Sequence, residues 1–568
     1  MENKQLAKPF RQLAQLLELY EENSFKVKAV ASAGLKIDKS PLLLWELPAR
    51  ELEKIEGIGK SITAKIIEIR LSGVLAELEE LKNKTPSGIL DMLRIKGLGP
   101  KKTRIIWKEM ELDTLADLYY ACNENRLVEI KGFGSKTQEE IKKVLEFTFR
   151  SQGKFLYFIA EPITLDWLNQ IRKINGVLEV LVSGAMRRKI EVVEEIEFVV
   201  KCSSPTQVAD QLTAYLNGIE GIGWQEFSTT LLLPECQILA FKDISGIPVR
   251  IYLTNEYHFI ETLFLTTGNA AHLSALGLTL PGPENEQAIY TAQGLQYIEP
   301  EMREGLNEIA LARQGGIKKL IHFSDLKGSI HNHSTHSDGV HTLLEMANAC
   351  ISLGLEYIVM TDHSQAAFYA HGLTPGQLIV QHAEIDKLNK SLAPFHIFKG
   401  IESDILSDGS LDYKQDVLGT FDIIIASIHS NLRMDLDKAM IRLIKAIENP
   451  YTTILGHATG RLLLGREGYP IDHKKIIDAC ARNEVVIEIN ANPNRLDLDW
   501  RYIPYALEQG VMLSINPDAH RIEGILDMRY GTHMARKGGL CKEVCLSTYT
   551  CNELSSWIAA RKERKGTA

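Results

Sequence analysis

The chain of 568 residues is 45% hydrophobic and 24% charged, a composition typical of a soluble protein with about four domains. Its net charge of −9 argues against a protein that coats nucleic acid with its whole surface, but leaves room for local basic patches. The eight cysteines are too scattered for a disulfide framework, and neither a membrane helix nor a signal-peptide core is found. We therefore expect a cytoplasmic protein without a membrane partner.

The first 150 residues are predicted to be helical and contain three similar Gly-x-Gly turns. The turns lie in "IEGIGKSITAKIIEI", "IKGLGPKKTRIIWKEM" and "IKGFGSKTQEEIKKVL", each with a helix after it and lysine nearby. Such helix-hairpin-helix units present backbone N–H groups at a helix start, where a DNA phosphate can bind without sequence preference. The alternative is a set of tight corners in a helical bundle. The predicted DNA-binding residues are Gly57, Gly59, Lys60, Lys65, Gly97, Gly99, Lys101, Lys102, Gly132 and Gly134.

Between about residues 155 and 300 the pattern mixes strands such as "EIEFVVKC" and "IPVRIYLT" with helices. A charged segment broken by glycines, "EPEMREGLNEIALARQGGIKKLIHFSD", is predicted to link this part to the next domain. From about residue 327, short apolar strands alternate with amphipathic helices. This alternation is typical of a parallel α/β layer or barrel.

The strands after residue 327 end repeatedly in a histidine or a carboxylate. "YIVMTDH" ends at His363, "HIFKGIE" at Glu402, "DIIIASIH" at His429 and "TTILGH" at His457, while "VMLSINPDAH" supplies Asp518 and His520. In a parallel barrel the carboxyl ends of the strands converge on one rim, and buried polar side chains are costly without partners. We therefore predict a metal cluster at this rim. The alternative is a polar barrel mouth that binds no ion.

The residue types restrict the metal and the reaction. Imidazoles with a few carboxylates and no thiolate favour Zn²⁺, Mn²⁺ or Fe²⁺ over Ca²⁺ or Mg²⁺. Closely spaced divalent ions clamp the oxygens of a phosphate, so hydrolysis of a phosphoester is the expected reaction. Cys541, Cys545 and Cys551 match no common zinc module, and we expect buried thiols there.

Seven motifs of this half resemble, in order, the polymerase-and-histidinol-phosphatase (PHP) domain: "HNHSTHSDG", "TDHS", "GIESDIL", "ASIHS", "ILGHATGR", "EINANPNRLDL" and "PDAH". The resemblance implies a distorted, TIM-like (β/α)₇ barrel that holds three divalent metal ions. It assigns nine metal ligands: His331, His333, Asp338, His363, Glu402, His429, His457, Asp518 and His520. Glu402 takes the bridging position and, with Asp518 and His333, is expected to be catalytic. His336, His341 and His371 match no ligand position, and Arg461, Asn490 and Arg495 either contact substrate phosphate or support the barrel.

Over nearly its whole length the chain resembles the bacterial family X DNA polymerases. The implied multidomain α+β order is a lyase-like helical domain at 1–84, a fingers-like helix-hairpin-helix domain at 85–150, a nucleotidyltransferase-like palm at 151–235, a thumb-like domain at 236–315, a linker at 316–326 and the PHP barrel at 327–568. Lys65 falls at the position of the family's Schiff-base lysine, while Ser61 replaces another lysine. Lys65 is therefore either a nucleophile for an abasic deoxyribose or a phosphate contact.

The polymerase motif departs from the family pattern, Gly-Ser-x-Arg-Arg followed by Asp-x-Asp. In "SGAMRRKIEVVEEIEFVV", Gly184, Arg187 and Arg188 are kept. Glu195 and Glu197 replace the two aspartates, and Arg250 falls at a third aspartate position on a later strand. Mg²⁺ tolerates little deviation from ideal ligand distances, and a cation among its ligands repels it. We therefore predict weak or absent nucleotidyl transfer. For the same reason, Mg²⁺ binding at the polymerase site is doubtful.

The sequence thus predicts a monomeric, metal-dependent phosphoesterase that acts on DNA, and the family resemblance implies a role in base-excision repair. The resemblance implies a 3′→5′ exonuclease, with 3′-phosphatase or abasic-site cleavage as further activities, on gapped, nicked or 3′-ended DNA. Three alternatives stay open. They are an active gap-filling polymerase whose barrel proofreads, a non-catalytic DNA-binding scaffold whose metals are structural, and a small-molecule phosphatase.

Overall fold

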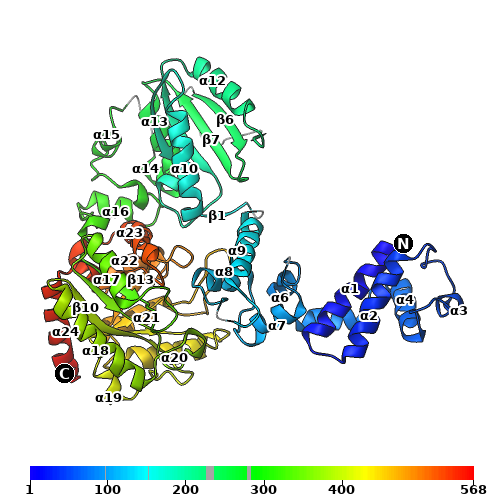
Figure 1. The fold of residues 1–568 in the computed structure, drawn as a ribbon. Helices are drawn as coiled ribbons and strands as arrows, with labels where there is room; N and C mark the ends of the chain where they lie inside the picture. The colour runs from blue at the N-terminus through cyan, green and yellow to red at the C-terminus, as the bar shows by residue number, and fades with distance from the viewer. Residues whose placement is uncertain (96, 129, 151–152, 226–235, 278–282, 568) are drawn as a thin grey trace. The chain divides into compact units, whose positions relative to one another are not determined.

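The computed structural model describes residues 1–568 except 96, 129, 151–152, 226–235, 278–282 and 568. The chain forms two compact units, Met1–Glu146 and Phe147–Ala568 (Figure 1). The described helices are all too short or too polar to span a lipid bilayer. The domain boundaries predicted at residues 151 and 235 fall outside the described residues.

The N-terminal unit consists of helices in its described part. They are α1 (Asn3–Leu19), α2 (Ser24–Lys39), α3 (Ala49–Leu52), α4 (Lys60–Ser72), α5 (Ala76–Lys84), α6 (Ser87–Met92), α7 (Pro100–Lys108), α8 (Leu115–Asn123) and α9 (Ser135–Arg150). α1 buries Leu6, Phe10, Leu13 and Leu17, which recur at the three- and four-residue spacing of one helix face. That face packs against α2, α5 and α7.

The three Gly-x-Gly turns share one backbone geometry. The first glycine of each turn has a positive φ of +86° at Gly57, +95° at Gly97 and +99° at Gly132, a region that glycine adopts without a steric penalty. The second glycine of the first two turns, Gly59 or Gly99, is the N-cap of α4 or α7, and no side chain caps either helix start. The N–H groups at these two helix starts therefore lack a side-chain cap.

The second unit begins with a five-stranded sheet in the order β2-β4-β7-β6-β5. Its strands are β2 (Val177–Ser183), β4 (Ile196–Cys202), β7 (Pro248–Thr254), β6 (Cys236–Lys242) and β5 (Gly223–Trp224), and only β4 and β7 pair in parallel. Side chains alternate across β4. Phe198 and Val200 join the core that includes α10 (Tyr157–Ile171) and α12 (Pro205–Asn217), whereas Val199 packs on α13 (Phe259–Thr267). A short pair, β1 (Phe155–Leu156) and β3 (Val192–Val193), lies beside α10.

A smaller helical part follows this sheet. It contains α14 (Ala270–Leu276), α15 (Glu286–Thr291) and α16 (Glu308–Arg313), packed around a separate apolar cluster. Arg303 is fully buried beside this cluster, where its guanidinium donates to the Glu286 carboxylate over 2.5 Å. An arginine is tolerated inside because this carboxylate and the carbonyl oxygen of Ile298 accept from it.

The C-terminal half is a nearly closed barrel of seven parallel strands, in chain order from β8 to β14 (Figure 1). The strands are β8 (Gly328–Asn332), β9 (Tyr357–Met360), β10 (His396–Asp404), β11 (Ile423–Ser427), β12 (Ile454–Leu455), β13 (Val486–Asn490) and β14 (Leu513–Asn516). β8 approaches the end of β14 through a parallel bridge between Asn332 and Ala519. The TIM-like barrel that the resemblance to the PHP domain implies is therefore confirmed.

Helices surround the barrel strands and connect them. They are α17 (Leu343–Ser352), α18 (Pro375–Leu392), α19 (Gln415–Leu418), α20 (Leu436–Ile447), α21 (His473–Arg482), α22 (Ile503–Glu508), α23 (Met528–Lys537) and α24 (Cys551–Lys565). Inside the barrel, Phe398, Ile423 and Ile454 join Leu554 and Ile558 of α24 in one apolar cluster. Because apolar side chains fill the amino-terminal part of the interior, polar side chains can gather at its carboxyl end.

Within this second unit, carboxylates of the sheet and the small helical part face basic groups of the barrel. Lys537 of α23 is 3% exposed. Its ammonium donates to the Glu304 carboxylate over 2.5 Å and to the carbonyl oxygens of Arg188 and Glu301 over 3.0 and 3.1 Å. Further pairs are Glu191 with Trp500 and Arg501, Glu161 with Tyr530, and Glu301 with Arg536.

Replacing Lys537 should destabilise the second unit. In Lys537→Met the Glu304 carboxylate stays buried with only Arg188 as its cationic partner, so we expect a loss of about 2–3 kcal/mol in unfolding free energy. Urea unfolding of the full chain followed by circular dichroism measures it. The matched control is Lys438→Met, whose ammonium lies 3.5 Å from Asp435 at the surface and should contribute less than about 1 kcal/mol. Equal effects of the two substitutions would contradict this account.

Candidate metal centre

The nine predicted ligands come from six strand ends and meet at the carboxyl end of the barrel. His331 lies on β8 and Glu402 on β10, while the other seven follow β8, β9, β11, β12 or β14. All nine are buried except Asp338 and His429, which are partly buried. The loop that carries Asp338 lies tightly on the first arm, because a β-carbon at Gly339 would meet the His333 carbonyl at 2.6 Å.

One carboxylate lies at the centre of this cluster. Glu402 is 1% exposed and has five imidazoles around it. Its Oε1 lies 2.9 Å from His457 Nε2, 3.0 Å from His429 Nε2 and 3.3 Å from His331 Nε2, and its Oε2 lies 3.1 Å from His363 Nδ1 and 3.6 Å from His333 Nε2. A residue so placed can bridge ions that different histidines bind.

Two aspartates complete the arrangement. Asp518 Oδ1 lies 3.3 Å from His333 Nε2 and 3.4 Å from His331 Nε2. Asp338 Oδ2 lies 3.6 Å from His363 Nε2, and its Oδ1 lies 3.4 Å from His520 Nε2. Three overlapping groups have all ligand atoms within 4.8 Å of one another: His333, Asp338, His363 and His520; His331, His333 and Asp518; and His363, Glu402 and His429. These groups fit the binding of metal ions.

Several ring nitrogens of the cluster are buried without a hydrogen bond. Among the described residues, His331 Nε2, both ring nitrogens of His333 and His363 Nδ1 have no hydrogen-bond partner. Such atoms cost free energy unless another partner satisfies them. Neutral imidazole nitrogens and carboxylates that converge in a buried site are the ligands that zinc, manganese and iron prefer. The residues present therefore fit a divalent cation.

The pKa values of the ligands shift in both directions. Burial lowers the pKa of His331 and His429, but the carboxylates beside them outweigh it and raise the pKa of His331, and that of His429 to about 10, so a cation that binds these rings must displace a proton. Burial lowers the pKa of His363 to about 3 against the opposing pull of Asp338 and Glu402, so its ring stays neutral and able to bind a cation. Burial would raise the pKa of Glu402. His429, His331 and His363 outweigh it and hold the pKa of this carboxyl well below its usual range.

Glu488 on β13 is a functional candidate that the sequence interpretation missed. Its carboxylate accepts from His331 Nδ1 over 2.7 Å, which turns the Nε2 atom of that ring toward the cluster. It also accepts from the backbone N–H of His457 over 3.1 Å and from the side-chain amides of Asn490 and Asn516. The detectable signal was the single charged residue of this buried strand, between Ile487 and Ile489.

Two further carboxylates position ligands, one through a ligand ring and the other through the loop that carries ligands. Asp404 accepts from His429 Nδ1 over 2.5 Å. Asp362 accepts from the Ser334 N–H and hydroxyl, both over 2.7 Å, and from the Ser337 hydroxyl over 2.5 Å, which fixes the loop between His333 and Asp338. Both residues stand beside or near a predicted ligand in the sequence, but nothing in their spacing separates them from ordinary surface carboxylates.

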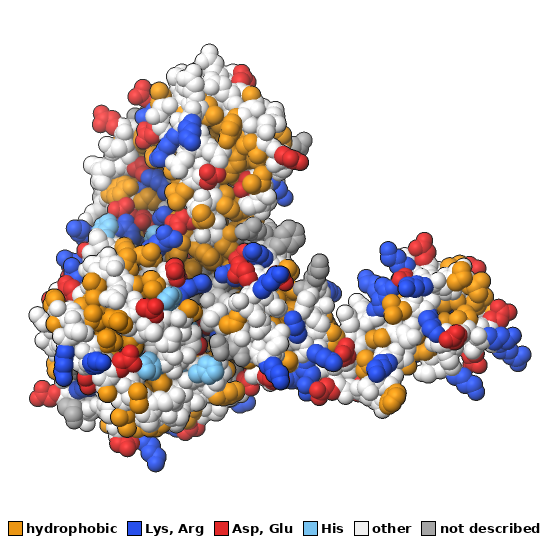
Figure 2. Space-filling view, viewed as in Figure 1, with side chains coloured by type: hydrophobic (Ala, Val, Ile, Leu, Met, Phe, Trp, Pro, Cys, Tyr) orange, Lys and Arg blue, Asp and Glu red, His pale blue; other side chains and the backbone are white. Residues whose placement is uncertain are grey.

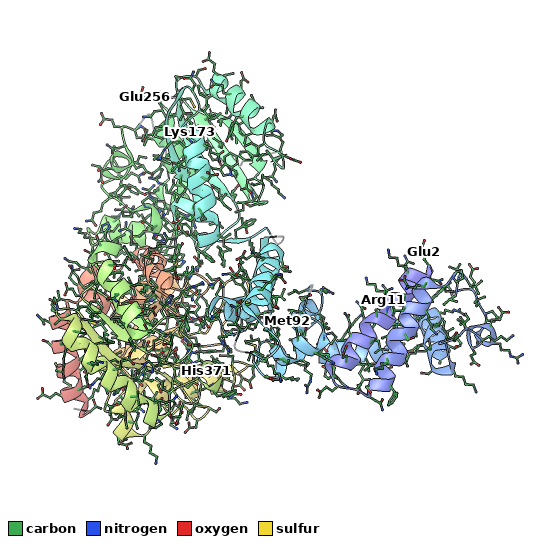
Figure 3. All side chains as sticks on the ribbon, viewed as in Figure 1. Glu2, Arg11, Met92, Lys173, Glu256 and His371 are labelled. Atoms are coloured by element: carbon green, nitrogen blue, oxygen red, sulfur yellow. The ribbon has the colours of Figure 1, made fainter. Side chains whose placement is uncertain are left out.

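The remaining residues singled out in this half lie around the cluster. His336 pairs with Glu384 over 3.1 Å, and His341 Nδ1 accepts from the Ile522 N–H over 3.4 Å. His371 is exposed on the barrel (Figure 3). Arg461 binds Asp499 over 2.5 Å and the Arg495 carbonyl oxygen over 3.0 Å, which supports the segment after β13.

Asn490, Arg495 and the three C-terminal cysteines complete the set singled out in this half. Asn490 donates to Asp518 over 3.1 Å. The Arg495 guanidinium lies 3.8 Å from the same carboxylate. Cys541, Cys545 and Cys551 are free thiols, of which the first two are buried.

In the N-terminal unit, Lys60 and Lys101 are exposed at the starts of α4 and α7, and lysine and arginine side chains are frequent on the visible face of this unit (Figure 2). Lys102 Nζ lies 5.3 Å from the centre of the Phe133 ring. Lys65 pairs with Glu77, which also binds Lys26 over 2.8 Å. An ammonium engaged in this way is less available as a nucleophile.

The predicted polymerase site is occupied by its own charges. Arg250 and Glu197 are partners in the register of β7 and β4. The Arg250 guanidinium lies 2.6 Å from Glu195 and 3.4 Å from Glu197, and the Tyr252 hydroxyl donates to Glu197 over 3.0 Å. Burial and then Glu195 raise the pKa of Glu197 against the opposing effect of Arg250. The Glu197 carboxylate also fills the space over Gly184, where a β-carbon would meet Oε2 at 1.7 Å.

Both arginines of the motif are engaged as well. Arg187 donates two hydrogen bonds to the Glu286 carboxylate, over 3.0 and 2.5 Å, and one to the Thr267 hydroxyl over 2.9 Å. Arg188 donates to Glu304 over 3.1 Å and to the Thr267 carbonyl oxygen over 2.7 Å. Internal carboxylates thus occupy the guanidinium groups that an incoming phosphate would need.

Comparison with known proteins assigns the family. The chain is 34% identical to the "DNA polymerase/3′-5′ exonuclease PolX" of Bacillus subtilis over 561 residues, which cover 95% of this chain and 96% of that protein. The chain belongs to the PolX family. Models of a helix-hairpin-helix domain and of a SAM-like helix-hairpin-helix tandem match residues 1–75 and 89–146 of this PolX member, so the prediction of helix-hairpin-helix units is confirmed.

The C-terminal part of this PolX member also has shorter relatives. A probable phosphatase of Thermoanaerobacter sp. is 27% identical over 248 residues, 42% of this chain and 96% of that protein. A probable phosphatase of Vibrio parahaemolyticus is 27% identical over 252 residues, again 42% of this chain and 96% of that protein. The barrel of this PolX member is thus similar to proteins named as phosphatases, and its relatives are enzymes.

Removing the charge of Glu488 should weaken metal binding. In Glu488→Gln the acceptor for His331 Nδ1 loses its charge, and in Glu488→Ala it is lost altogether. We expect Mn²⁺ affinity to fall by about 10-fold in the first variant and about 100-fold in the second. Competition with a chelating dye measures the affinity independently of catalysis. Glu484→Gln, at an exposed glutamate beside Arg564, is the matched control. Wild-type affinity in Glu488→Ala would refute the assignment.

Proposed function

We propose that this PolX member is a metal-dependent 3′→5′ exonuclease whose active site is the barrel cluster, acting on gapped, nicked or 3′-ended DNA in repair. The observation that carries the proposal is the convergence of nine predicted ligands in one buried cluster, in which five imidazoles surround Glu402. A structural ion needs four ligands, so nine ligands, one of which is a carboxylate beside five imidazoles, exceed what stability requires. The name of the Bacillus subtilis relative includes this activity.

The three overlapping ligand groups suggest three ions, and their imidazole-rich composition favours Mn²⁺, Zn²⁺ or Fe²⁺. When bound, such ions supply Lewis acidity to the phosphoester and a nucleophile at neutral pH. Glu402, Asp518 and His333, which lie beside one another, would hold these ions for the reaction. Glu488 and Asp404 keep His331 and His429 in the tautomers that direct Nε2 inward.

The N-terminal unit supports DNA as the substrate. Its Gly-x-Gly turns leave the helix starts at Gly59 and Gly99 without side-chain caps, and the positive end of a helix binds phosphate. Lys60 and Lys101 are exposed at the same helix starts. Contacts of this kind hold the sugar–phosphate backbone without reading the bases. A small-molecule phosphatase would have no use for them.

We further propose that the palm does not polymerise. Arg250 neutralises both glutamates that stand where the family has metal-binding aspartates. Glu286 and Glu304 occupy Arg187 and Arg188. Binding two Mg²⁺ ions and a nucleotide would require breaking these ion pairs, and Arg250 would still repel the ions.

The exonuclease is tested with 5′-labelled DNA that carries a gap, in Mn²⁺ and without nucleotides. We expect progressive shortening from the 3′ end, its loss after chelation and its return with added Mn²⁺. His333→Ala should lower the rate at least about 100-fold, because it removes a ligand shared by two of the three groups. His336→Ala, in the same loop but outside those groups, should retain most activity.

Other outcomes of that experiment decide between the alternatives. A free phosphomonoester hydrolysed faster than DNA would indicate a small-molecule phosphatase instead. Binding of gapped DNA without any hydrolysis, at full metal occupancy, would indicate a scaffold. Equal loss of activity in His333→Ala and His336→Ala would show that the loop, and not the ligand, matters.

The palm is tested by primer extension on the same DNA with nucleotides and Mg²⁺ or Mn²⁺, in the His333→Ala background to prevent degradation. We expect no extension by this protein. The triple substitution Glu195→Asp, Glu197→Asp and Arg250→Asp should restore slow extension, because it returns three short carboxylates and removes the cation. Template-dependent extension without the triple substitution would overturn the proposal.

A further inference from the structure

Directly after the cluster ligand His363, the chain leaves the barrel in a short loop and returns to the same strand end. This rim loop comprises residues 364–372. Its base is closed by the Leu373 N–H, which donates to the His363 carbonyl oxygen over 2.8 Å, and by a bridge between Ser364 and Leu373. The rim loop therefore begins and ends at the metal centre.

The rim loop is held in one shape by internal contacts. The Ala366 N–H donates to the Asp412 carboxylate over 2.6 Å, and Asp412 is itself bound through its N–H to Ser403, the neighbour of Glu402. Gly372 closes the turn, where a β-carbon would meet the Ser364 carbonyl oxygen at 1.8 Å. These anchors tie the loop to β10 as well as to His363, so the side chains it carries are pre-positioned.

Two aromatic rings stand on a 3₁₀ turn in this loop, η3 (Phe368–Ala370). The Tyr369 ring lies edge-on to the His363 ring at 6.3 Å between centres, and the Phe368 ring lies edge-on to Tyr369 at 6.0 Å. Phe368 thus contacts Tyr369, which in turn contacts the cluster ligand His363. At about 3.4 Å of strand per nucleotide, a DNA end bound at the cluster brings its last few bases within this distance.

Phe368 is 74% exposed, whereas the neighbouring Ala367 and Ala370 are fully buried. Exposing a phenylalanine side chain in place of burying it costs about 1.5–3 kcal/mol, so a folded loop that presents one has no stability reason to do so. A single exposed apolar residue is common on surfaces. An exposed aromatic ring on an anchored turn beside the cluster is a stronger indication of a binding site, because a DNA base has a π-face that can stack on it.

We propose that Phe368 is the stacking platform for a base near the 3′ end of the DNA strand whose phosphate enters the metal centre. The inference rests on the proposed exonuclease and adds the group that selects a nucleic acid over a simple phosphomonoester. Stacking is tolerant of sequence, since all four bases have a π-face. It therefore agrees with the backbone contacts expected of the helix-hairpin-helix turns.

Binding is measured first, separately from catalysis. Single-stranded DNA with 2-aminopurine at the last, second or third position from the 3′ end, and with phosphorothioate linkages there to slow hydrolysis, is added to the full-length protein with Mn²⁺. We expect fluorescence quenching above that of free DNA at one of these positions. Phe368→Ala should abolish this additional quenching and Phe368→Trp should retain it. Ile379→Ala, which removes a residue 73% exposed on α18, is the control and should leave the quenching unchanged.

Turnover then separates this inference from the proposed function. Phe368→Ala should raise the KM for single-stranded DNA about 10-fold or more, with kcat and hydrolysis of p-nitrophenyl phosphate unchanged. Replacing the stacked base by an abasic analogue should raise the KM of the unsubstituted protein equally and leave Phe368→Ala unaffected. Equal KM values for both proteins on normal DNA overturn the inference and leave the exonuclease intact. Absence of DNA hydrolysis by the unsubstituted protein overturns the exonuclease itself.

Discussion

The burial of Glu402 is the constraint on which the barrel depends. A carboxylate that is 1% exposed has lost its water, a loss worth several kcal/mol unless charges or hydrogen bonds replace it. Five imidazoles replace it here, His331 and His333 from the end of β8 and His363, His429 and His457 from the ends of β9, β11 and β12, so several strands must end beside one carboxylate. A closed parallel barrel satisfies this condition, since its carboxyl ends point to one rim. The barrel fold and the cluster therefore meet the same requirement, which is to surround a buried carboxylate with imidazoles.

A second set of carboxylates, to which Glu488 belongs, holds the cluster histidines in place. Glu488 links His331 of β8, the backbone of His457 after β12, Asn490 of β13 and Asn516 of β14. A single side chain thus joins four strand ends beneath the ligands. Since a shift of one strand would leave Glu488 with an unpaired charge in a dry interior, the network fixes the register of the barrel and the aim of the histidines together. The apolar cluster under α24 stabilises the opposite end without any such directional requirement.

Much of this arrangement could be predicted from the sequence, for identifiable reasons. The alternation of apolar strands with amphipathic helices predicts a parallel layer or barrel, and six of the cluster residues stand at the ends of predicted strands; the barrel form and the other three ligands were implied by the resemblance to the PHP domain. The Gly-x-Gly turns were predictable because only glycine adopts a φ near +90° easily, as Gly57 and Gly97 do. The carboxylates that position the ligands could not be predicted, because the roles of Glu488 and Asp362 depend on hydrogen bonds to residues 157 and 28 positions away. Pairing across such separations is decided by the fold, so the single acid between Ile487 and Ile489 marks Glu488 as unusual without revealing its partners.

The two halves of the second unit show opposite treatments of clustered charge. In the barrel, carboxylates are surrounded by imidazoles, which are neutral when deprotonated and can give their lone pairs to a cation. In the palm, Glu195 and Glu197 face Arg250, whose guanidinium has no lone pair to give and does not deprotonate in a protein. Both solutions satisfy the buried acids, but only the first leaves a site that a metal ion can enter. Lys537 of the barrel half connects the two parts, because its ammonium donates to the Glu304 carboxylate and to the carbonyl oxygen of Arg188. The sheet that carries Glu195 and Glu197 is thus fixed by its own ion pairs, whereas the barrel cluster keeps ring nitrogens whose lone pairs a cation can use.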